Sequence, residues 1–257
     1  MNQVNREKIV SELKSIPGLK GIVACGDGYS SKASAVLLYY VPEERFFQEL
    51  DQAISRMDAA GLLIEYSLRE IGLVDLAISD CLDGKIMVKH KSGHPFGVVN
   101  SSCVAEIHFG RILWEGSDQL VTALKKQVSA QGAYPEKLRQ ATIVYFMKEA
   151  TLALGNGHSA ALQGDIHYAS GSFFHAACSW VQVIHALNRQ FLLNEKGGVK
   201  RANQLPISPK QFNLRVNQIY RYFAANNPKL AYCEIDMLEN EMNVLVKSFA
   251  EAKEGSL

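Results

Sequence analysis

Residues 31–40, SKASAVLLYY, form the stretch that decides which fold we expect. From residue 34 to residue 40 the stretch is almost wholly apolar or aromatic, and Pro42 follows it closely, so it predicts a buried strand over 34–40. A second apolar run, IGLVDLAISD at 71–80, has Asp75 at its centre, and we expect a strand over 73–79. A carboxylate in a buried strand is costly unless it has a partner. Asp75 is therefore a candidate functional residue.

The rest of the N-terminal half changes element after about every ten to fifteen residues, as a layered α/β arrangement does. Phe46, Leu50, Ile54 and Met57 recur at helical spacing and predict an amphipathic helix that packs on the sheet. The other expected elements of this half are a helix at 7–16, strands at 21–25 and 62–68, and a tight turn that begins at Gly26.

From about residue 120 onward, the sequence predicts helices almost throughout. Pro135 suits the first turn of a long helix, where its missing N–H loses no partner, and Gly155-Asn156-Gly157 predicts the end of that helix. Asp165 is a candidate N-cap for the next helix, and Asn227-Pro228 begins the last one. We therefore expect an α+β fold, with a mixed-sheet domain at 1–115 followed by an all-α helical bundle domain at 116–257.

The composition is typical of a globular protein. The chain has 257 residues, of which 47% are hydrophobic and 21% charged, and its formal net charge is +1. Without clustered Lys and Arg to neutralise phosphates, nucleic acid is not expected as a partner. No apolar stretch reaches the roughly 20 residues of a membrane span, and the N-terminus is not signal-like, so we expect a cytoplasmic protein without a membrane partner. The five scattered cysteines predict free thiols.

Several stretches carry a resemblance to a known superfamily. They are LLYY-x-P at 37–42, VDLAISD at 74–80, SGHPFG at 92–97, AYPEKLRQA at 133–141 and VQVIHALNRQFLLNEKG at 181–197. With a small mixed-sheet domain before a helical one, the chain resembles the DNA polymerase β-like nucleotidyltransferases, in particular the kanamycin- and lincosamide-type members and a bacterial family with the same layout.

Members of this superfamily hold a nucleoside triphosphate with a Gly-Ser turn and two Mg²⁺ ions with an Asp-x-Asp strand. The resemblance places the nucleotide-binding turn at Gly26-Asp27, where the Asp27 charge would repel phosphate. It places the two metal-binding aspartates at Ala33 and Ala35, and the third carboxylate at Asp75. The implied metal site has therefore kept one ligand of three. The alternative is a shifted register, in which both alanines are ordinary strand residues.

The resemblance also implies roles for residues of the helical half. Lys196 would reach the nucleotide phosphates, and Glu149, or else Glu106, would act as general base toward an acceptor hydroxyl. Simpler roles are open for each of these residues, since a lysine in the last turn of a helix complements the helix dipole. Asp75 could likewise be a lone polar residue that pairs with Arg69 or with a backbone amide.

Three functions stay open at this point. The first is a degenerate nucleotidyltransferase that binds a nucleotide or small molecule in the cleft between its domains without transferring nucleotides. The second is an active enzyme that uses Mg²⁺ and a nucleoside triphosphate to modify a hydroxyl of an antibiotic or another small acceptor, with Asp27 and Asp80 joining Asp75 around the metal. The third is a non-catalytic module whose helical bundle binds a protein or a second copy of the chain as a homodimer. We expect the first, because a methyl group offers Mg²⁺ no oxygen ligand and phosphoryl transfer depends on the metal.

Overall fold

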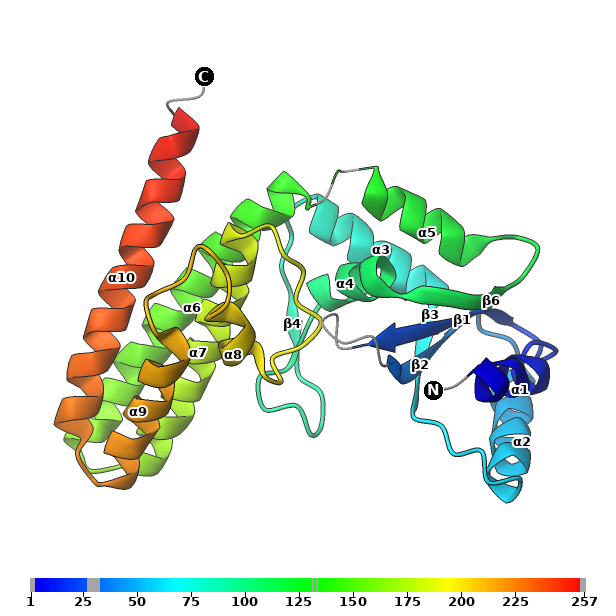
Figure 1. Ribbon diagram of the computed structural model, residues 1–257, viewed down its shortest axis with the longest axis horizontal. Helices are drawn as coiled ribbons and strands as arrows, with labels where there is room; N and C mark the ends of the chain where they lie inside the picture. The colour runs from blue at the N-terminus through cyan, green and yellow to red at the C-terminus, as the bar shows by residue number, and fades with distance from the viewer. Residues whose placement is uncertain (1–2, 27–32, 131, 133, 255–257) are drawn as a thin grey trace. The chain divides into compact units, whose positions relative to one another are not determined.

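The computed structural model describes residues 3–26, 33–130, 132 and 134–254 (Figure 1). The chain divides into two compact units, one made of residues 1–83 and 100–133 and the other of residues 84–99 and 134–257. The fold is of the mixed α+β type, with a small mixed sheet and many helices. Among the described residues, no helix is both long enough and apolar enough to cross a membrane.

The first unit is built on a four-stranded sheet with the order β3-β2-β1-β6. Strands β1 (Leu19–Gly26) and β2 (Ala33–Tyr40) are antiparallel neighbours, as are β1 and β6 (Arg111–Glu115). Strand β3 (Tyr66–Glu70) runs parallel to β2. The strands expected at 21–25 and 34–40 are confirmed, because continuous apolar runs between turn residues leave the chain few alternatives. The strand expected at 62–68 begins four residues later than predicted.

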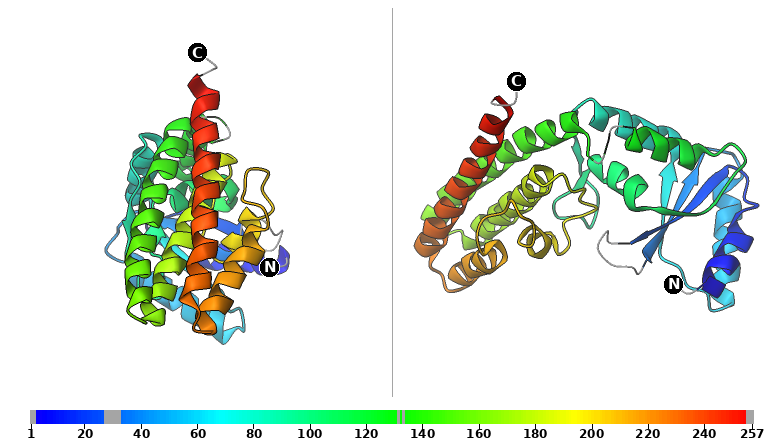
Figure 2. Two further views of the ribbon diagram at one scale, coloured as in Figure 1. Left: turned by 90° about the vertical axis from the view of Figure 1, so that its left-hand side faces the viewer. Right: turned by 45° about the horizontal axis from the view of Figure 1, so that its top comes forward.

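Helices cover both faces of this sheet (Figure 2, right). On one face, α1 (Gln3–Leu13) and α2 (Phe46–Ala59) pack against Val36 and Leu38 of β2 in one apolar cluster. The helices α3 (Ile71–Leu82), α4 (Ser101–Phe109) and α5 (Leu120–Ser129) lie beyond the other face. Because side chains alternate along a strand, Leu37 and Tyr39 are directed to this second face, where both are buried.

The strand predicted at 73–79 is wrong, because these residues belong to the helix α3. Its buried residues are Val74, Ile78 and Cys81, which are four and three positions apart and therefore share one helical face. A short apolar run is compatible with a buried strand or a buried helix, and periodicity alone does not separate the two. The packing of α3 on α4 and β3 selects the helix.

The second unit contains a bundle of helices and a short two-stranded ladder of β4 (Val88–Lys89) and β5 (Val98–Val99). The helices are α6 (Glu136–Leu162), α7 (Ile166–Leu187), α8 (Gly198–Ala202), α9 (Phe212–Ala224) and α10 (Pro228–Glu254). Figure 2 (left) shows α6 and α10 side by side, and the Thr151 hydroxyl donates to Glu239 between them at 3.0 Å. Helix α7 lies at the centre of the bundle, with Phe173, Trp180 and Ile184 fully buried.

Local signals at the helix ends of the second unit were partly right. Asp165 is the N-cap of α7, since its side chain accepts a hydrogen bond from the Tyr168 N–H at 3.0 Å. The last helix begins at Pro228, as predicted. The helix end expected at Gly155-Asn156-Gly157 was wrong, because α6 continues to Leu162. Gly157 instead allows close packing: a Cβ there would lie 2.6 Å from Tyr232 Oη.

The boundary expected at residue 115 differs from the division that the structure has. Helix α5 belongs to the first unit, where it packs on α4 and β1. Residues 84–99 belong to the second unit, where Phe96 packs on Phe146 of α6 with the ring centroids 6.0 Å apart. Residues 84–99 of the second unit therefore interrupt the first unit in the sequence, so a single domain boundary does not describe the division.

Candidate functional site

The two alanines that the resemblance aligns with metal-binding aspartates lie at the start of β2. Ala33 pairs with Gly26, and Ala35 pairs with Cys25, in the ladder between β1 and β2. Gly26 is the last residue of β1, while Asp27 lies outside the described residues. Among the described residues, β1 and β2 are therefore paired antiparallel strands, and β2 has alanine at both positions.

Asp75 does not lie on the strand beside β2. It is exposed on α3, directly after the buried Val74. Strand β2 lies between β1 and β3, and Tyr66 of β3 pairs with Val36. The expectation of a buried carboxylate at position 75 was therefore wrong, because it rested on the strand that proved to be a helix. An exposed carboxylate needs no partner to compensate for desolvation, so its presence in an apolar run has an ordinary explanation.

Glu106 of α4 is a part-buried acid of the first unit, and it is paired with Arg69 of β3. Arg69 Nε donates to Glu106 Oε2 at 2.7 Å, and Nη2 donates to Oε1 at 2.5 Å. The two side chains are 23% and 13% exposed. Burial alone would lower the pKa of Arg69, but the hydrogen bonds and charge of Glu106 outweigh it and raise that pKa. Both carboxylate oxygens are thus occupied by one guanidinium, and Arg69 is the partner of Glu106 rather than of Asp75.

The groups around this ion pair are either buried and neutral or hydrogen-bonded to the backbone. Arg69 pairs in register with Tyr39, whose pKa is raised by burial and by the charge of Glu106. The same two causes raise the pKa of Cys25 to about 11, so its side chain is a neutral thiol at pH 7. Lys125 Nζ donates to the carbonyl oxygens of Ile107 and Gly110, at 2.6 and 2.7 Å, and so caps the end of α4.

A metal centre would need several ligands to converge. Within the ranges that the structure describes, no group of three or more His, Cys, Asp or Glu side chains is placed to hold a metal ion. The alternative in which Asp27 and Asp80 join Asp75 around a metal involves one residue outside those ranges. Of the other two, Asp75 is exposed on α3 and Asp80 follows five residues later on the same helix.

Lys196, the expected phosphate ligand, is exposed in the segment between α7 and α8. Its backbone N–H donates to Asn194 Oδ1 at 3.0 Å, which holds it in a local turn. Its neighbour Glu195 is more buried and accepts a hydrogen bond from Gln182 Nε2 at 3.1 Å; burial raises the pKa of Glu195. A contact between Lys196 and a phosphate stays a prediction.

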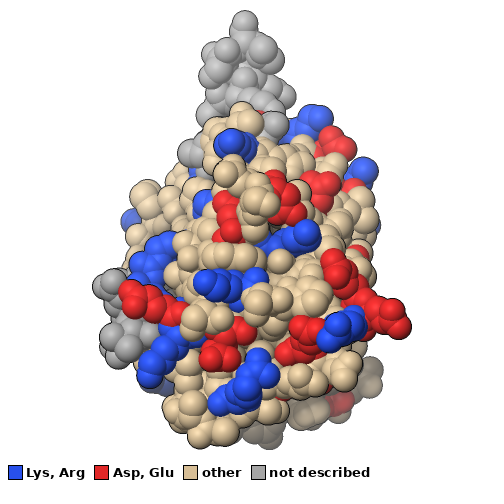
Figure 3. Space-filling view, turned by 90° about the vertical axis from the view of Figure 1, so that its right-hand side faces the viewer, with Lys and Arg blue, Asp and Glu red and all other residues tan. Residues whose placement is uncertain are grey.

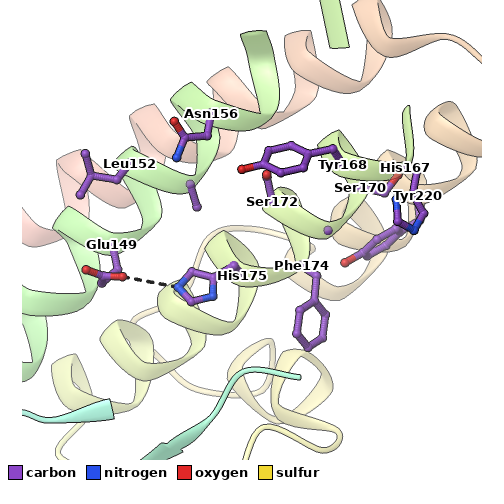
Figure 4. A pocket seen from close by; sticks show the side chains of 12 residues that line it. Glu149, Leu152, Asn156, His167, Tyr168, Ser170, Ser172, Phe174, His175 and Tyr220 are labelled. Carbon is purple, nitrogen blue, oxygen red and sulfur yellow. Dashed lines mark ion pairs between the residues drawn. The ribbon is translucent and has the colours of Figure 1, made fainter. Parts of the chain in front are cut away.

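Glu149, the expected base, lies in a pocket of the second unit (Figure 4). The pocket has a volume of about 1060 Å³ and is lined by residues of α6 and α7 together with Tyr220 of α9. This volume is at the upper end of the range of about 300–1,000 Å³ that is usual for small-molecule sites. Glu149 Oε2 lies 3.5 Å from His175 Nε2, so the two side chains form an ion pair when the imidazole is protonated.

His175 packs against the segment that connects β4 and β5. Phe96, from the SGHPFG segment, lies with its ring centroid 4.9 Å from that of His175 and also stacks on Phe146. The SGHPFG motif thus contributes an aromatic ring that contacts a residue of the pocket. His185, ten residues further along α7, is instead fully buried, with Nδ1 2.8 Å from the Val181 carbonyl oxygen.

Surface charge is mixed on the face that Figure 3 shows, where lysine and arginine side chains are interspersed with aspartate and glutamate. Several ion pairs of the first unit are of this exposed kind, among them Lys20–Asp118 at 3.0 Å and Arg45–Glu49 at 2.8 Å. Such pairs contribute little to stability, at most about 1 kcal/mol each. They leave no broad area of one charge on this face.

Comparisons with known proteins add no assignment. No model of a known protein family matches the chain, and a search of curated proteins finds no match either.

Two features of these sites were missed from the sequence. The Arg69–Glu106 pair joins residues 37 positions apart, and nothing in the local pattern connects them. The pocket had a weak signal: His167, Gly171 and His175 recur at intervals of four residues, opposite the apolar stripe of their helix. Such a polar stripe on an otherwise apolar bundle helix marks the face that is not packed in the core.

Proposed function

We propose that this chain is a nucleotidyltransferase-like protein that binds a small molecule and does not transfer nucleotides. The observation that carries the proposal is the part-buried ion pair of Arg69 with Glu106. The backbone of β1 and β2, with alanine at positions 33 and 35, supports it. The pocket around Glu149 and His175 supplies space for a ligand.

The physical argument concerns the oxygen ligands that Mg²⁺ requires. Phosphoryl transfer relies on metal ions to position the triphosphate and to neutralise its developing charge. Glu106 is a part-buried acid of α4, and both its oxygens accept hydrogen bonds from Arg69. To bind a metal, Glu106 would have to give up its hydrogen bonds with Arg69, and leaving a largely buried cation without its partner costs several kcal/mol.

A transfer assay tests the proposal directly. The full chain is incubated with each nucleoside triphosphate, with Mg²⁺ or Mn²⁺, and with a panel of hydroxylated acceptors, and pyrophosphate release is measured. We expect no release above that of a protein-free sample. Metal-dependent release above that of the protein-free sample would contradict the proposal.

A gain-of-binding experiment tests the strand register. Ala33→Asp with Ala35→Asp adds two carboxylates to β2, and we expect it to raise Mn²⁺ affinity measured by electron paramagnetic resonance. The matched control is Ala33→Asn with Ala35→Asn, which has nearly the same size without the charge. If the aspartate pair binds Mn²⁺ no better than the asparagine pair, the positions assigned to the lost ligands are wrong.

A further inference from the structure

The pocket of the second unit has an open floor at Gly171. A Cβ built on Gly171 would meet no other atom within 4 Å, although the residue lies in the middle of helix α7. Figure 4 shows Glu149 and Asn156 toward one side of the pocket and Tyr220 toward the other. All of these residues belong to the second unit. The cavity is therefore a property of the helical bundle alone.

The charge of the pocket favours a cation over an anion. Among the described residues that line it, Glu149 is the one carboxylate, and none is lysine or arginine. A phosphate would thus meet a carboxylate and no permanent cation, whereas an ammonium group would find an ionised acceptor. Glu149 is 34% exposed, so it can be reached from the pocket. Its present contact with His175, at 3.5 Å, is long enough to be replaced by a shorter charge-assisted hydrogen bond.

The walls of the pocket favour a flat apolar body. Tyr168, Phe174 and Tyr220 line it together with Leu152 and Ala153. Tyr220 is fixed from behind by an edge-on contact with Phe173, at 5.2 Å between ring centroids. Aromatic faces attract both other rings and cations. Asn156 and Ser172 add hydrogen-bonding groups that can orient a bound molecule.

We propose that this pocket binds an aromatic amine, a flat ring system that carries one ammonium group, with the ammonium on Glu149 and the ring against the aromatic walls. The proposal rests on the small-molecule binding proposed above and names the class and place of the ligand. It does not depend on the absence of nucleotidyl transfer.

Three indoles of nearly equal size test the charge preference. Tryptamine is a cation at neutral pH, tryptophol is neutral and indole-3-acetate is an anion, and each is titrated into the full chain by calorimetry, with ATP in parallel. We expect tryptamine to bind about tenfold or more tighter than tryptophol, because a hydrogen bond to a charged group contributes about 1.5–3 kcal/mol. Glu149→Gln should remove this preference and leave tryptophol binding unchanged.

Two glycine substitutions test the location. Gly171→Leu fills the floor of the pocket, and we expect it to abolish binding of all the indoles. Gly155→Leu is the matched control: Gly155 also lies in a helix with no atom within 4 Å of a Cβ, but it does not line the pocket. Both changes replace glycine by a good helix former, so neither should lower the melting temperature.

The outcomes separate the two proposals. Equal binding of tryptamine and tryptophol would refute the aromatic-amine class while leaving small-molecule binding intact. Binding that survives Gly171→Leu in a folded protein would refute the location. If no indole binds, the aromatic-amine proposal falls; if ATP and a general small-molecule panel also fail to bind, the proposed ligand-binding function falls with it.

Discussion

Replacing Arg69 by methionine tests whether Glu106 is held by its ion pair. The substitution keeps an unbranched side chain of similar length and removes the guanidinium, so Glu106 is left without the partner of both its oxygens. Removing one member of a buried pair typically costs about 3–5 kcal/mol. Because the side chains keep 23% and 13% of their exposure, we expect the lower end, about 3 kcal/mol in the free energy of unfolding.

The double variant Arg69→Met with Glu106→Leu supplies the second half of the argument. It removes both charges, so the desolvation cost disappears together with the attraction, and we expect a stability within about 1 kcal/mol of the parent protein. Glu106→Leu alone leaves a buried guanidinium and should cost as much as Arg69→Met. The three variants form a double-mutant cycle, and these costs imply a coupling energy of about 5–7 kcal/mol in favour of the pair.

The assay must report on the first unit. The chain has two tryptophans, Trp114 in β6 of the first unit and Trp180 in the bundle of the second. In a Trp180→Phe background, the fluorescence of Trp114 during urea unfolding follows the first unit, and every comparison is made within that background. If Arg69→Met costs less than about 1 kcal/mol, or if the double variant is no more stable than the single ones, Glu106 does not depend on its ion pair with Arg69.

Two further predictions concern the second unit. Burial lowers the pKa of His185 from 6.5 to about 4, so the stability that its neutral form contributes is present above about pH 6.5 and is lost as the pH falls toward 4. The shift corresponds to about 3 kcal/mol in the free energy of unfolding. Unfolding measured at several pH values should therefore show a steeper fall of stability with falling pH in the parent than in His185→Asn. A methyl group at Gly157 would meet Tyr232 Oη at 2.6 Å and Ser172 Cβ at 2.7 Å, so Gly157→Ala should lower the free energy of unfolding by about 1–3 kcal/mol. Gly155→Ala, where the methyl group meets no atom, should instead raise the melting temperature. Equal effects at the two glycines would contradict the packing described for α6.

The order of helices and strands was largely accessible from local spacing. Strands β1 and β2, helix α2 and the starts of α7 and α10 all follow from apolar periodicity and from capping residues that act on their immediate neighbours. Helix α3 was missed because the run LVDLAIS satisfies both a buried strand and a buried helix. The unbroken α6 was missed because the glycines that signal a helix end also allow a close approach between helices.

The candidate sites depended on contacts between distant parts of the chain. Alanine at positions 33 and 35 can be seen in the sequence, which predicts that β2 offers no carboxylate at either position. That Arg69 neutralises Glu106, and that Glu149 meets His175 in a pocket with Gly171 at its floor, required the folded chain. The reason is physical: the spacing of apolar residues determines which backbone hydrogen bonds a segment can make with itself, but the partner of a charged side chain is determined by which elements pack together, and that information is spread over the whole chain.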